Sequence, residues 1–427
     1  MITTINNKHN KLNFSNEREQ SQACLNSAEH EKNQGRKVLN VPNLRFKEFQ
    51  GEWKELGLSE LLDFKNGLNP KPNKFGKGIK FISVMDILNN AVITYDCIKA
   101  SVDVTEKELS DFSVEKGDIL FQRSSETLED VGRANVYMDD KTSVFGGFVI
   151  RGKKKGEYDP QYFNYLLRSP FARKRIIPMG AGAQHFNIGQ EGLSKVKLHF
   201  ANIEEQKKIG NFLSLLDERI ATQNKIIEDL KKLKCAIIEK VYSEIQGKEY
   251  SYGQLFDVVN ERNKQMEYSN ILSASQEKGM VNRDDLNLDI QFERSNINTY
   301  KIVKKGNYVI HLRSFQGGFA FSDKLGVCSP AYTILRPNSI LEYGYLSNYF
   351  TSQRFIKSLV LVTYGIRDGR SINVDEWLRM KITIPPKEHQ QYIVKVIGTF
   401  ERKIEDEEAY AAQLSIQKQY LLRQMFV

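Results

Sequence analysis

The chain has 427 residues, enough for two or three domains, and its 40% hydrophobic content suffices for ordinary cores. Its four cysteines are scattered without CxxC or Cys/His spacing, which argues against a disulfide framework or a zinc site. No apolar run is long enough to span a bilayer and no signal-peptide pattern opens the chain. We therefore expect a cytoplasmic protein with no membrane partner.

The net charge of +9 is unevenly distributed along the chain. Residues 204–247 hold eight basic and eight acidic side chains, and residues 388–427 hold five and six. The positive excess therefore lies elsewhere, for example in residues 145–175. Basic segments of this kind favour DNA over a membrane surface as partner, because no basic amphipathic helix appears. The alternative is a moderately basic protein with solvated lysines.

Five segments follow one another in the chain. Residues 1–40 are polar and poor in pattern, which predicts a flexible tail or a marginal helix. Two blocks of mixed pattern, 41–200 and 248–385, are each followed by one long helical segment, 201–247 and 386–427. The sequence thus predicts two mixed globular domains and two long helices.

Both blocks combine short strand-like runs with a helical stretch, and glycine and proline mark their loops. In the first block the strand-like runs are 79–84, 118–122 and 144–151, and the helical stretch is 160–175. In the second block the runs are 307–312 and 331–336, and the helical stretch is 342–361.

The two long helical segments repeat the same apolar heptad seam 184 residues apart. The first seam comprises Ile209, Leu213, Leu216, Ile220, Ile227, Leu230 and Ile237. The second comprises Ile393, Ile397, Phe400, Ile404, Leu414 and Leu421. Both seams are interrupted at the same two places, by Gln223 and Glu407 and by Lys234 and Lys418. These polar side chains either fix the register of a helix pair or reach into solvent at the edge of the seam.

The repeat extends into the blocks. Lys116-Gly117-Asp118 resembles Lys305-Gly306-Asn307, and Glu205-Gln206 at the first helix start corresponds to His389-Gln390 at the second. Two similar halves in one chain can form a pseudo-two-fold arrangement, like a fused symmetric dimer. We therefore predict an α+β fold with two similar mixed α/β domains, separated by two long helices that pair as an antiparallel coiled coil.

Sequence signatures of covalent chemistry are absent. There is no GxxxxGK[ST] phosphate loop, and the lone Gly180-Ala181-Gly182 is better explained as a turn. Asn69-Pro70-Lys71-Pro72 lacks the aromatic residue that would stack on a flipped base. The six histidines form no ligand cluster, so we expect no catalytic residue and no metal site.

Taken together, the duplicated helices and basic blocks resemble a specificity subunit of a type I restriction–modification system over residues 41–427. The opening residues Val41 to Phe46 and Phe49 to Trp53 are similar to the start of many such subunits. The helix starts of this family usually carry Pro, a short gap, Glu-Gln and then Ile. The first copy here has Glu205-Gln206 and Ile209 without the proline, and the second has Pro386, Gln390 and Ile393 with His389 in place of Glu.

This resemblance implies a non-catalytic subunit that binds double-stranded DNA. Each domain would read one half of a bipartite target, and the helices would bind two modification (methyltransferase) subunits. Restriction subunits would complete the complex, and S-adenosylmethionine, ATP and Mg would be held by the other subunits. Two alternatives remain at this point: a fragment of a single-chain restriction or methylation enzyme, and a coiled-coil DNA-binding scaffold without methylation partners.

Candidate DNA-contacting residues are polar and basic side chains on loops of the blocks. After the Lys-Gly-Asp strand they are Gln122, Arg123 and Ser124, and at the matching place of the second half Arg313, Ser314 and Gln316. Just before the helix starts they are Gln184, His185, Arg367, Arg370 and Ser371. Lys153, Lys154, Arg173 and Lys174 are phosphate candidates. The alternatives are arginines that bond strand-end carbonyls, loops that cap a helix, and a solvated lysine face.

Overall fold

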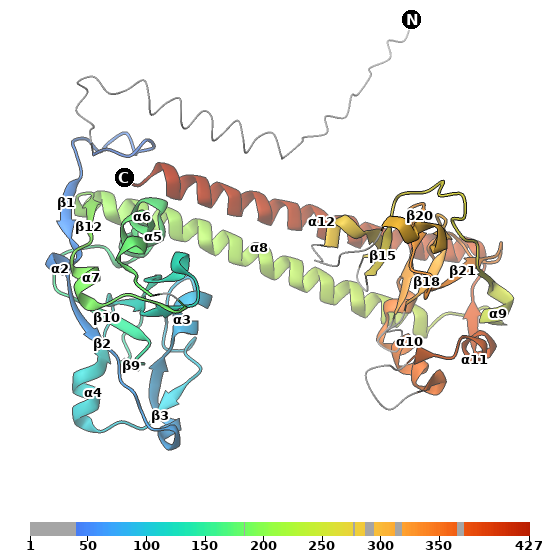
Figure 1. Cartoon of the computed structure of the whole chain (residues 1–427), viewed down its shortest axis with the longest axis horizontal. Helices are drawn as coiled ribbons and strands as arrows, with labels where there is room; N and C mark the ends of the chain where they lie inside the picture. Colours follow the sequence, from blue (N-terminus) through green and yellow to red (C-terminus); the bar gives the residue numbers. More distant parts are fainter. Residues whose placement is uncertain (1–39, 183, 276–277, 287–293, 312–317, 365–370) are drawn as a thin grey trace, which may run out of the picture. The chain divides into compact units, whose positions relative to one another are not determined.

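The computed structural model describes residues 40–182, 184–275, 278–286, 294–311, 318–364 and 371–427 (Figure 1). The chain forms two compact units. Of the described residues, unit 1 comprises those within 40–217 and 416–427, and unit 2 comprises those within 218–415. No helix among the described residues is both long enough and apolar enough to cross a membrane.

Unit 1 is built on a four-stranded antiparallel sheet in the order β2-β10-β6-β8. Its strands are Leu62–Asn66, Val149–Lys154, Ile119–Gln122 and Ala134–Val136. A second sheet has the order β4-β3-β9-β5, with strands Ser101–Val102, Phe75–Ile82, Ser143–Phe145 and Ser113–Val114. β1 (Lys54–Gly57) pairs antiparallel with β12 (Lys197–Phe200), which joins the start of the block to its end.

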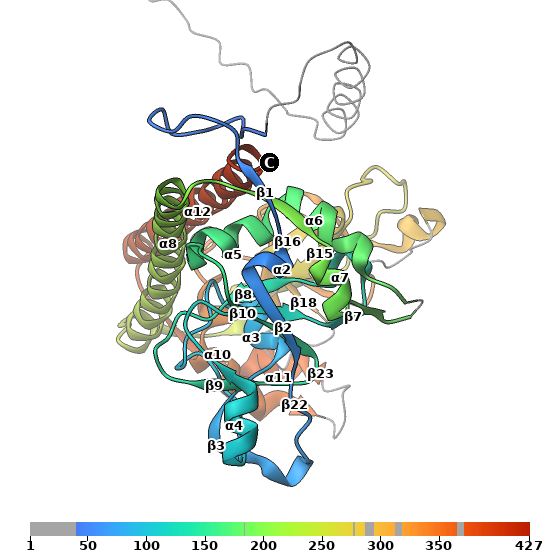
Figure 2. The same cartoon turned by 90° about the vertical axis from the view of Figure 1, so that its left-hand side faces the viewer.

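Short helices cover the first sheet of unit 1. The expected helical stretch 160–175 is two helices, α5 (Pro160–Arg168) and α6 (Pro170–Ile176), because Ser169 ends one and caps the other. α5 packs across β8 (Figure 2). α2 (Leu58–Leu61), α3 (Val84–Asn89) and α7 (Gln190–Ser194) also contact strands of this sheet. α4 (Glu106–Phe112) instead packs against β5 and β9 of the second sheet.

Unit 2 repeats this plan with a sheet in the order β14-β21-β18-β19. Its strands are Phe256–Val259, Thr333–Pro337, Tyr308–Ile310 and Phe319–Phe321. β13 (Lys248–Ser251) pairs with β24 (Lys381–Ile384), as β1 does with β12 in unit 1. Two further strand pairs are β15 (Leu272–Ser275) with β16 (Gly279–Asn282), and β17 (Lys301–Val303) with β20 (Gly326–Cys328).

Aromatic side chains dominate the core of unit 2. Trp377 on α11 (Val374–Arg379) stacks on Tyr252 of α9 (Tyr252–Leu255), with ring centroids 4.2 Å apart. The expected helix over 342–361 is wrong as one element, since only α10 (Gln353–Ser358) and short 3-10 turns form there. Gly344 has a φ of +73° and Ser352 caps α10, so the backbone leaves and re-enters helical geometry within this stretch.

The two long helices are α8 (Ile203–Ser243) and α12 (Lys387–Gln424). They run antiparallel, as their contacts in unit 2 show: Ile227 packs with Ile404 and Ala411, and Lys234 bonds Glu401. The thirteen predicted seam side chains are all buried or half-buried. The predicted α+β fold with two similar mixed domains and two long antiparallel helices is confirmed.

Each compact unit takes one end from each long helix. The core of unit 1 includes Ile209 and Leu213 from the start of α8, and Leu421, Met425 and Phe426 from the end of α12. The core of unit 2 includes Ile397 from the first half of α12, and Ile238 and Tyr242 from the end of α8. The end of α12 therefore packs in the core of unit 1, and the end of α8 packs in the core of unit 2.

The polar seam residues are paired, as the repeat requires. In unit 2 Lys234 Nζ lies 2.7 Å from Glu401, and in unit 1 Lys418 Nζ lies 2.5 Å from Asp217. Adding 184 to 234 gives 418, and adding 184 to 217 gives 401, so the two ion pairs are equivalent. Gln223 donates to Glu407, its own repeat equivalent. These side chains fix contacts between the helices and do not extend freely into solvent.

The repeated Lys-Gly-Asp/Asn motif forms the same turn in both units. Gly117 and Gly306 have φ values of +95° and +87°, a region that favours glycine. Asp118 accepts a hydrogen bond from Glu115 N at 3.0 Å, and Asn307 accepts one from Lys304 N at 2.8 Å. The motif thus has a structural role at the start of β6 and β18.

Candidate nucleic-acid interface

Several loops of unit 1 meet at one end of its first sheet. Gln122 at the end of β6 pairs with Val149 at the start of β10, and Ile150 pairs with Asn66 at the end of β2. The loops that follow β2 and β6 and the turn that precedes β10 therefore emerge together. We call this end of the sheet the loop end of unit 1.

The structure brings two of the predicted clusters together at the loop end. β7 (Ser124–Ser125) pairs antiparallel with β11 (Phe186–Asn187), and Ser124 Oγ bonds Asn187 Oδ1. Ala181 and Asn187 exchange backbone hydrogen bonds of 2.9 and 2.8 Å, which closes the loop between them. Gln184 and His185 are exposed on that loop. The candidates Arg123 and Ser124 are thus parts of one surface with Gln184 and His185.

Gln122 and Arg123 have different surroundings. Gln122 is only 5% exposed and donates from Nε2 to Ser124 O at 2.9 Å, so it supports the loop from inside. Arg123 is half-buried, and its Nη1 lies 3.4 Å from Gly147 O. Its backbone N donates to Phe148 O at 2.9 Å. Within the described part of the chain Arg123 has no carboxylate partner, so its charge remains available to an anion.

The lysine candidates lie at the opposite end of β10. Lys153 Nζ is 3.6 Å from Glu115, and Lys154 Nζ donates to Tyr158 O at 3.1 Å. The Lys154 ammonium also lies 4.7 Å from the centre of the Tyr158 ring. Five residues of a strand separate the two ends by roughly 16 Å. The structure therefore does not place Lys153 and Lys154 beside Arg123.

Arg173 is bonded to the backbone. Its guanidinium donates to the carbonyls of Gly132, Glu129 and Val131 at 2.9, 2.9 and 2.6 Å. Burial lowers its pKa to about 10, which still leaves it protonated at neutral pH. This geometry matches the structural alternative for an arginine, whereas the neighbouring Lys174 is exposed on α6.

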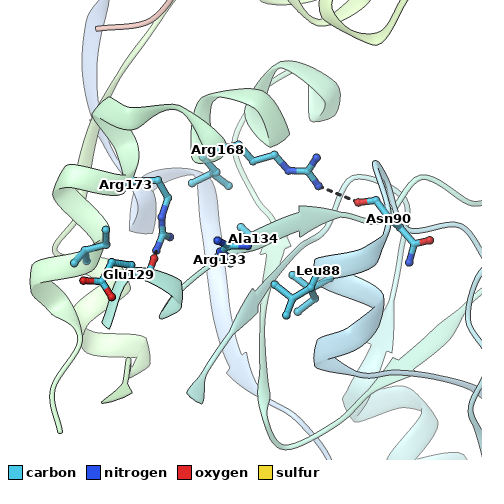
Figure 3. Close-up of a pocket in the computed structure, with 10 residues that line it drawn as sticks. Leu88, Asn90, Glu129, Arg133, Ala134, Arg168 and Arg173 are labelled. Atoms are coloured by element: carbon cyan, nitrogen blue, oxygen red, sulfur yellow. Dashed lines mark hydrogen bonds between the residues drawn. The ribbon is translucent and has the colours of Figure 1, made fainter. Parts of the chain in front are cut away.

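Arg173 also lines a pocket of about 410 Å³ in unit 1. Arg168 lines it too and donates to Asn90 O at 3.3 Å, and Arg133 bonds Asp130 at 2.6 Å. Figure 3 shows Arg168 and Arg173 pointing toward different sides of this pocket. The arginines do not converge on one point, and no group of three or more metal-ligating side chains gathers among the described residues.

Most candidates of the second half lie outside the described residues. Arg313, Ser314 and Gln316 fall within 312–317, and Arg367 and Arg370 fall within 365–370. Ser371 lies on β23 (Ser371–Ile372), which pairs with β22 (Thr363–Tyr364). His311 follows β18, is half-buried, and has its ring 6.2 Å from that of Tyr332.

Phe148 was missed at the loop end of unit 1. Its side chain is 68% exposed, on a turn that contains Gly146 and Gly147. The expected strand over 144–151 is wrong at this place, because it is two strands, β9 and β10, joined by this turn. Two consecutive glycines between two phenylalanines are a turn signal that could have identified it.

Comparisons with known proteins agree with this architecture. A family model for the type I restriction modification DNA specificity domain matches residues 50–232 and 247–415. The MjaX type I restriction enzyme specificity subunit of Methanocaldococcus jannaschii is 23% identical over 393 residues, covering 86% of this chain and 91% of that protein. The EcoKI specificity subunit of Escherichia coli K12 is 26% identical over 145 residues, 33% of this chain and 30% of that protein.

Solved structures share the fold. The S subunit of a type I restriction-modification system from M. genitalium has a TM-score of 0.52 at 15% identity, covering 91% of this chain and 99% of that one. A chain from a structure of type I restriction–modification complex assembly has a TM-score of 0.56 at 14% identity, covering 87% and 96%. This chain therefore belongs to the type I restriction–modification DNA specificity family, as a specificity subunit with two target recognition domains.

Proposed function

We propose that this subunit binds a bipartite double-stranded DNA target, with one half-site read by each unit. The observation that carries this proposal is the repeated plan of the units. Both units have a four-stranded sheet of the same connectivity, and in both a strand pair joins the start of the block to its end. In the sequence, one long helix follows each block. In unit 1, Arg123, Ser124, Gln184 and His185 share one surface, where they could contact base edges or phosphates.

The long helices are the proposed docking site for two modification subunits. In unit 2, Ile226 and Leu233 of α8 are 41% and 49% exposed, although both are large and apolar. They are seven residues apart, so they lie on one face of the helix, beside the seam. In unit 1, Leu215 of α8 is 64% exposed. Apolar side chains exposed along a helix are suited to packing against a helix of a partner protein.

In this proposal, methylation and restriction are carried out by the other subunits of the complex. The modification subunits would hold S-adenosylmethionine and methylate adenine, and the restriction subunits would use ATP and Mg. The proposed role of this chain is to place those subunits on a chosen sequence, without a cofactor of its own. The purified chain should therefore not methylate DNA, and activity should appear when a modification subunit is added.

Methylome sequencing tests this function. Host DNA with and without the gene should differ at one bipartite motif. Replacing residues 248–385 with the matching block of a relative should change one half-site and preserve the other. A chain with its own block 248–385 reinserted by the same cloning junctions is the control. A change in both half-sites, or no dependence of methylation on the gene, would contradict the proposal.

A further inference from the structure

Phe148 is an exposed aromatic residue in an otherwise well-buried part of unit 1. Phe145, before the two glycines of the turn, and Val149, after Phe148, are both 0% exposed, whereas Phe148 is 68% exposed. Burial of a phenylalanine side chain would stabilise the fold, so this position gains nothing for folding from an aromatic ring. A residue of this type at this place is better explained by contact with a ligand.

The turn that carries Phe148 is held on several sides by backbone hydrogen bonds. Val149 N donates to Gly146 O at 2.8 Å, which closes the turn, and Gly146 N donates to Ile82 O at 3.0 Å. Arg123 N donates to Phe148 O at 2.9 Å, which ties the turn to the loop after β6. The Asn69 side chain lies against Gly147, where a Cβ atom would meet its Oδ1 at 2.0 Å. The ring is therefore presented from a fixed backbone, which reduces the entropy lost on binding.

The surroundings of Phe148 are those of a nucleic-acid contact. The Arg123 guanidinium contacts the carbonyl of Gly147, the residue before Phe148, and no salt bridge found among the described residues involves it. Ser124, on β7, and the exposed Gln184 and His185 belong to the same loop end. One rigid aromatic ring beside a cation and hydrogen-bonding side chains fits a base stack flanked by phosphates. Apolar side chains of this kind unstack base steps in known complexes, and aromatic rings stack on bases.

We infer that Phe148 is a wedge residue of unit 1, which inserts at a base step of the bound half-site while Arg123 contacts the adjacent phosphate or base edge. This inference rests on the proposed DNA-binding function. It adds a specificity determinant, because the cost of opening a base step depends on its sequence. Pyrimidine–purine steps, which unstack most easily, are expected at the position that Phe148 contacts.

The test uses the intact complex of the chain with its modification subunits. The probe is a duplex that carries the methylation motif found by sequencing, with 2-aminopurine in turn in place of each adenine of both half-sites except the methylated ones, because methyltransferases flip their target base out of the stack. The wild-type complex should raise the fluorescence at one step, in the half-site that unit 1 reads. Phe148→Ala should abolish that increase and weaken binding to the motif at least about fivefold. Phe148→Trp should preserve both.

Phe75→Ala is the matched control, since Phe75 is another exposed aromatic residue of unit 1, on β3, and its loss should change neither signal. Wild-type affinity and fluorescence in Phe148→Ala would overturn the inference and leave the proposed function intact. Loss of modification subunits from Phe148→Ala in the absence of DNA would also overturn it, because Phe148 would then contact protein. A wild-type complex that does not prefer its motif over other duplexes would refute the proposed function itself.

Discussion

The two long helices each carry a buried glutamine near their start, and these two side chains make equivalent contacts in unit 1 and in unit 2. Gln206 is 4% exposed, accepts from Asp159 N at 2.9 Å and donates to Ala201 O at 2.8 Å. Gln390 is 1% exposed, accepts from Glu342 N at 2.7 Å and donates to Pro385 O at 2.9 Å. In unit 1 this side chain joins the start of α8 to Asp159, which caps α5. In unit 2 it joins the start of α12 to Glu342.

The preceding residue differs between the units. Glu205 is completely buried and accepts from Arg45 Nε and Nη2, each at 2.7 Å, whereas the equivalent His389 is exposed. Arg45 belongs to the segment that precedes β1, and the hydrogen bond from Leu44 N to Gln424 O at 2.8 Å ties this segment to the end of α12. The two residues therefore have different roles. The glutamine makes equivalent contacts in both units, whereas Glu205 binds Arg45 in the segment before β1, and among the described residues of unit 2 His389 has no such role.

The equivalence of the halves predicts that a fragment of residues 41–247 forms a symmetric dimer. Burial of each apolar seam side chain contributes about 1.5–3 kcal/mol, which summed over a seam exceeds the association cost of about 4–15 kcal/mol. The fragment lacks three core residues of unit 1, namely Leu421, Met425 and Phe426. A second copy can supply their equivalents 184 residues earlier, namely Ile237, Val241 and Tyr242.

Light scattering on the purified fragment measures this effect, the largest that we expect. A variant with Ile227→Asp and Ile237→Asp is the control and should remain monomeric, because both changes place a charge in the seam. With a modification subunit present, the wild-type fragment should direct methylation to an inverted repeat of one half-site. A folded, monomeric wild-type fragment would show that the halves are not equivalent.

Removal of Arg45 should destabilise unit 1 alone. Arg45→Ala leaves the buried carboxylate of Glu205 without its partner, which costs about 3–5 kcal/mol. The chain has two tryptophans, and each reports on one core: Trp53 in unit 1 and Trp377 in unit 2. In a Trp377→Phe background, denaturant unfolding followed by Trp53 fluorescence should show the loss. His389→Ala, measured through Trp377, is the matched control and should change stability by less than about 0.5 kcal/mol.

Removal of either glutamine should affect its own unit to a similar extent. Gln206→Leu leaves the N–H of Asp159 and the carbonyl of Ala201 without their side-chain partner, at about 1–3 kcal/mol per buried group. Gln390→Leu likewise affects the N–H of Glu342 and the carbonyls of Ile340 and Pro385. We expect losses of at least about 2 kcal/mol in each case. The Trp53 transition should respond to the first variant and the Trp377 transition to the second. If Gln206→Leu were neutral while Gln390→Leu were not, the shared role would be disproved.

The smallest effect, a change in the pH dependence of stability, is expected at Glu407, which bonds its repeat equivalent Gln223. Hydrogen bonds from Lys403 and then from Gln223 hold the pKa of Glu407 below its usual value of 4.5. The stabilisation is therefore present above the unfolded pKa and is lost as the pH falls through the lower folded value. Glu407→Gln makes the pair Gln–Gln and removes this contribution to acid sensitivity. Trp377-monitored stability between neutral and acid pH should thus be slightly flatter in the variant, and a steeper dependence would contradict the assignment.

The sequence by itself determined the two long helices, their shared seam and the order of the blocks. A heptad pattern depends on local periodicity, and a repeat at constant spacing is visible without coordinates. The repeat of the Lys-Gly-Asp/Asn motif was equally visible in the sequence, whereas the positive φ of its glycine came from the structure. The family resemblance followed from these features and was confirmed by the comparisons.

Only the tertiary structure decided what individual polar and aromatic side chains do. The sequence alone does not distinguish an arginine that bonds three backbone carbonyls, as Arg173 does, from one that contacts a single carbonyl at a loop end, as Arg123 does. Residues 124–125 and 186–187 become one surface through strand pairing over long sequence separation, which no local pattern encodes. The exposure of Phe148 likewise depends on a turn that is held by Ile82 of β3 and by Arg123, between β6 and β7. Which core each end of the long helices fills also depends on the packing of the whole chain.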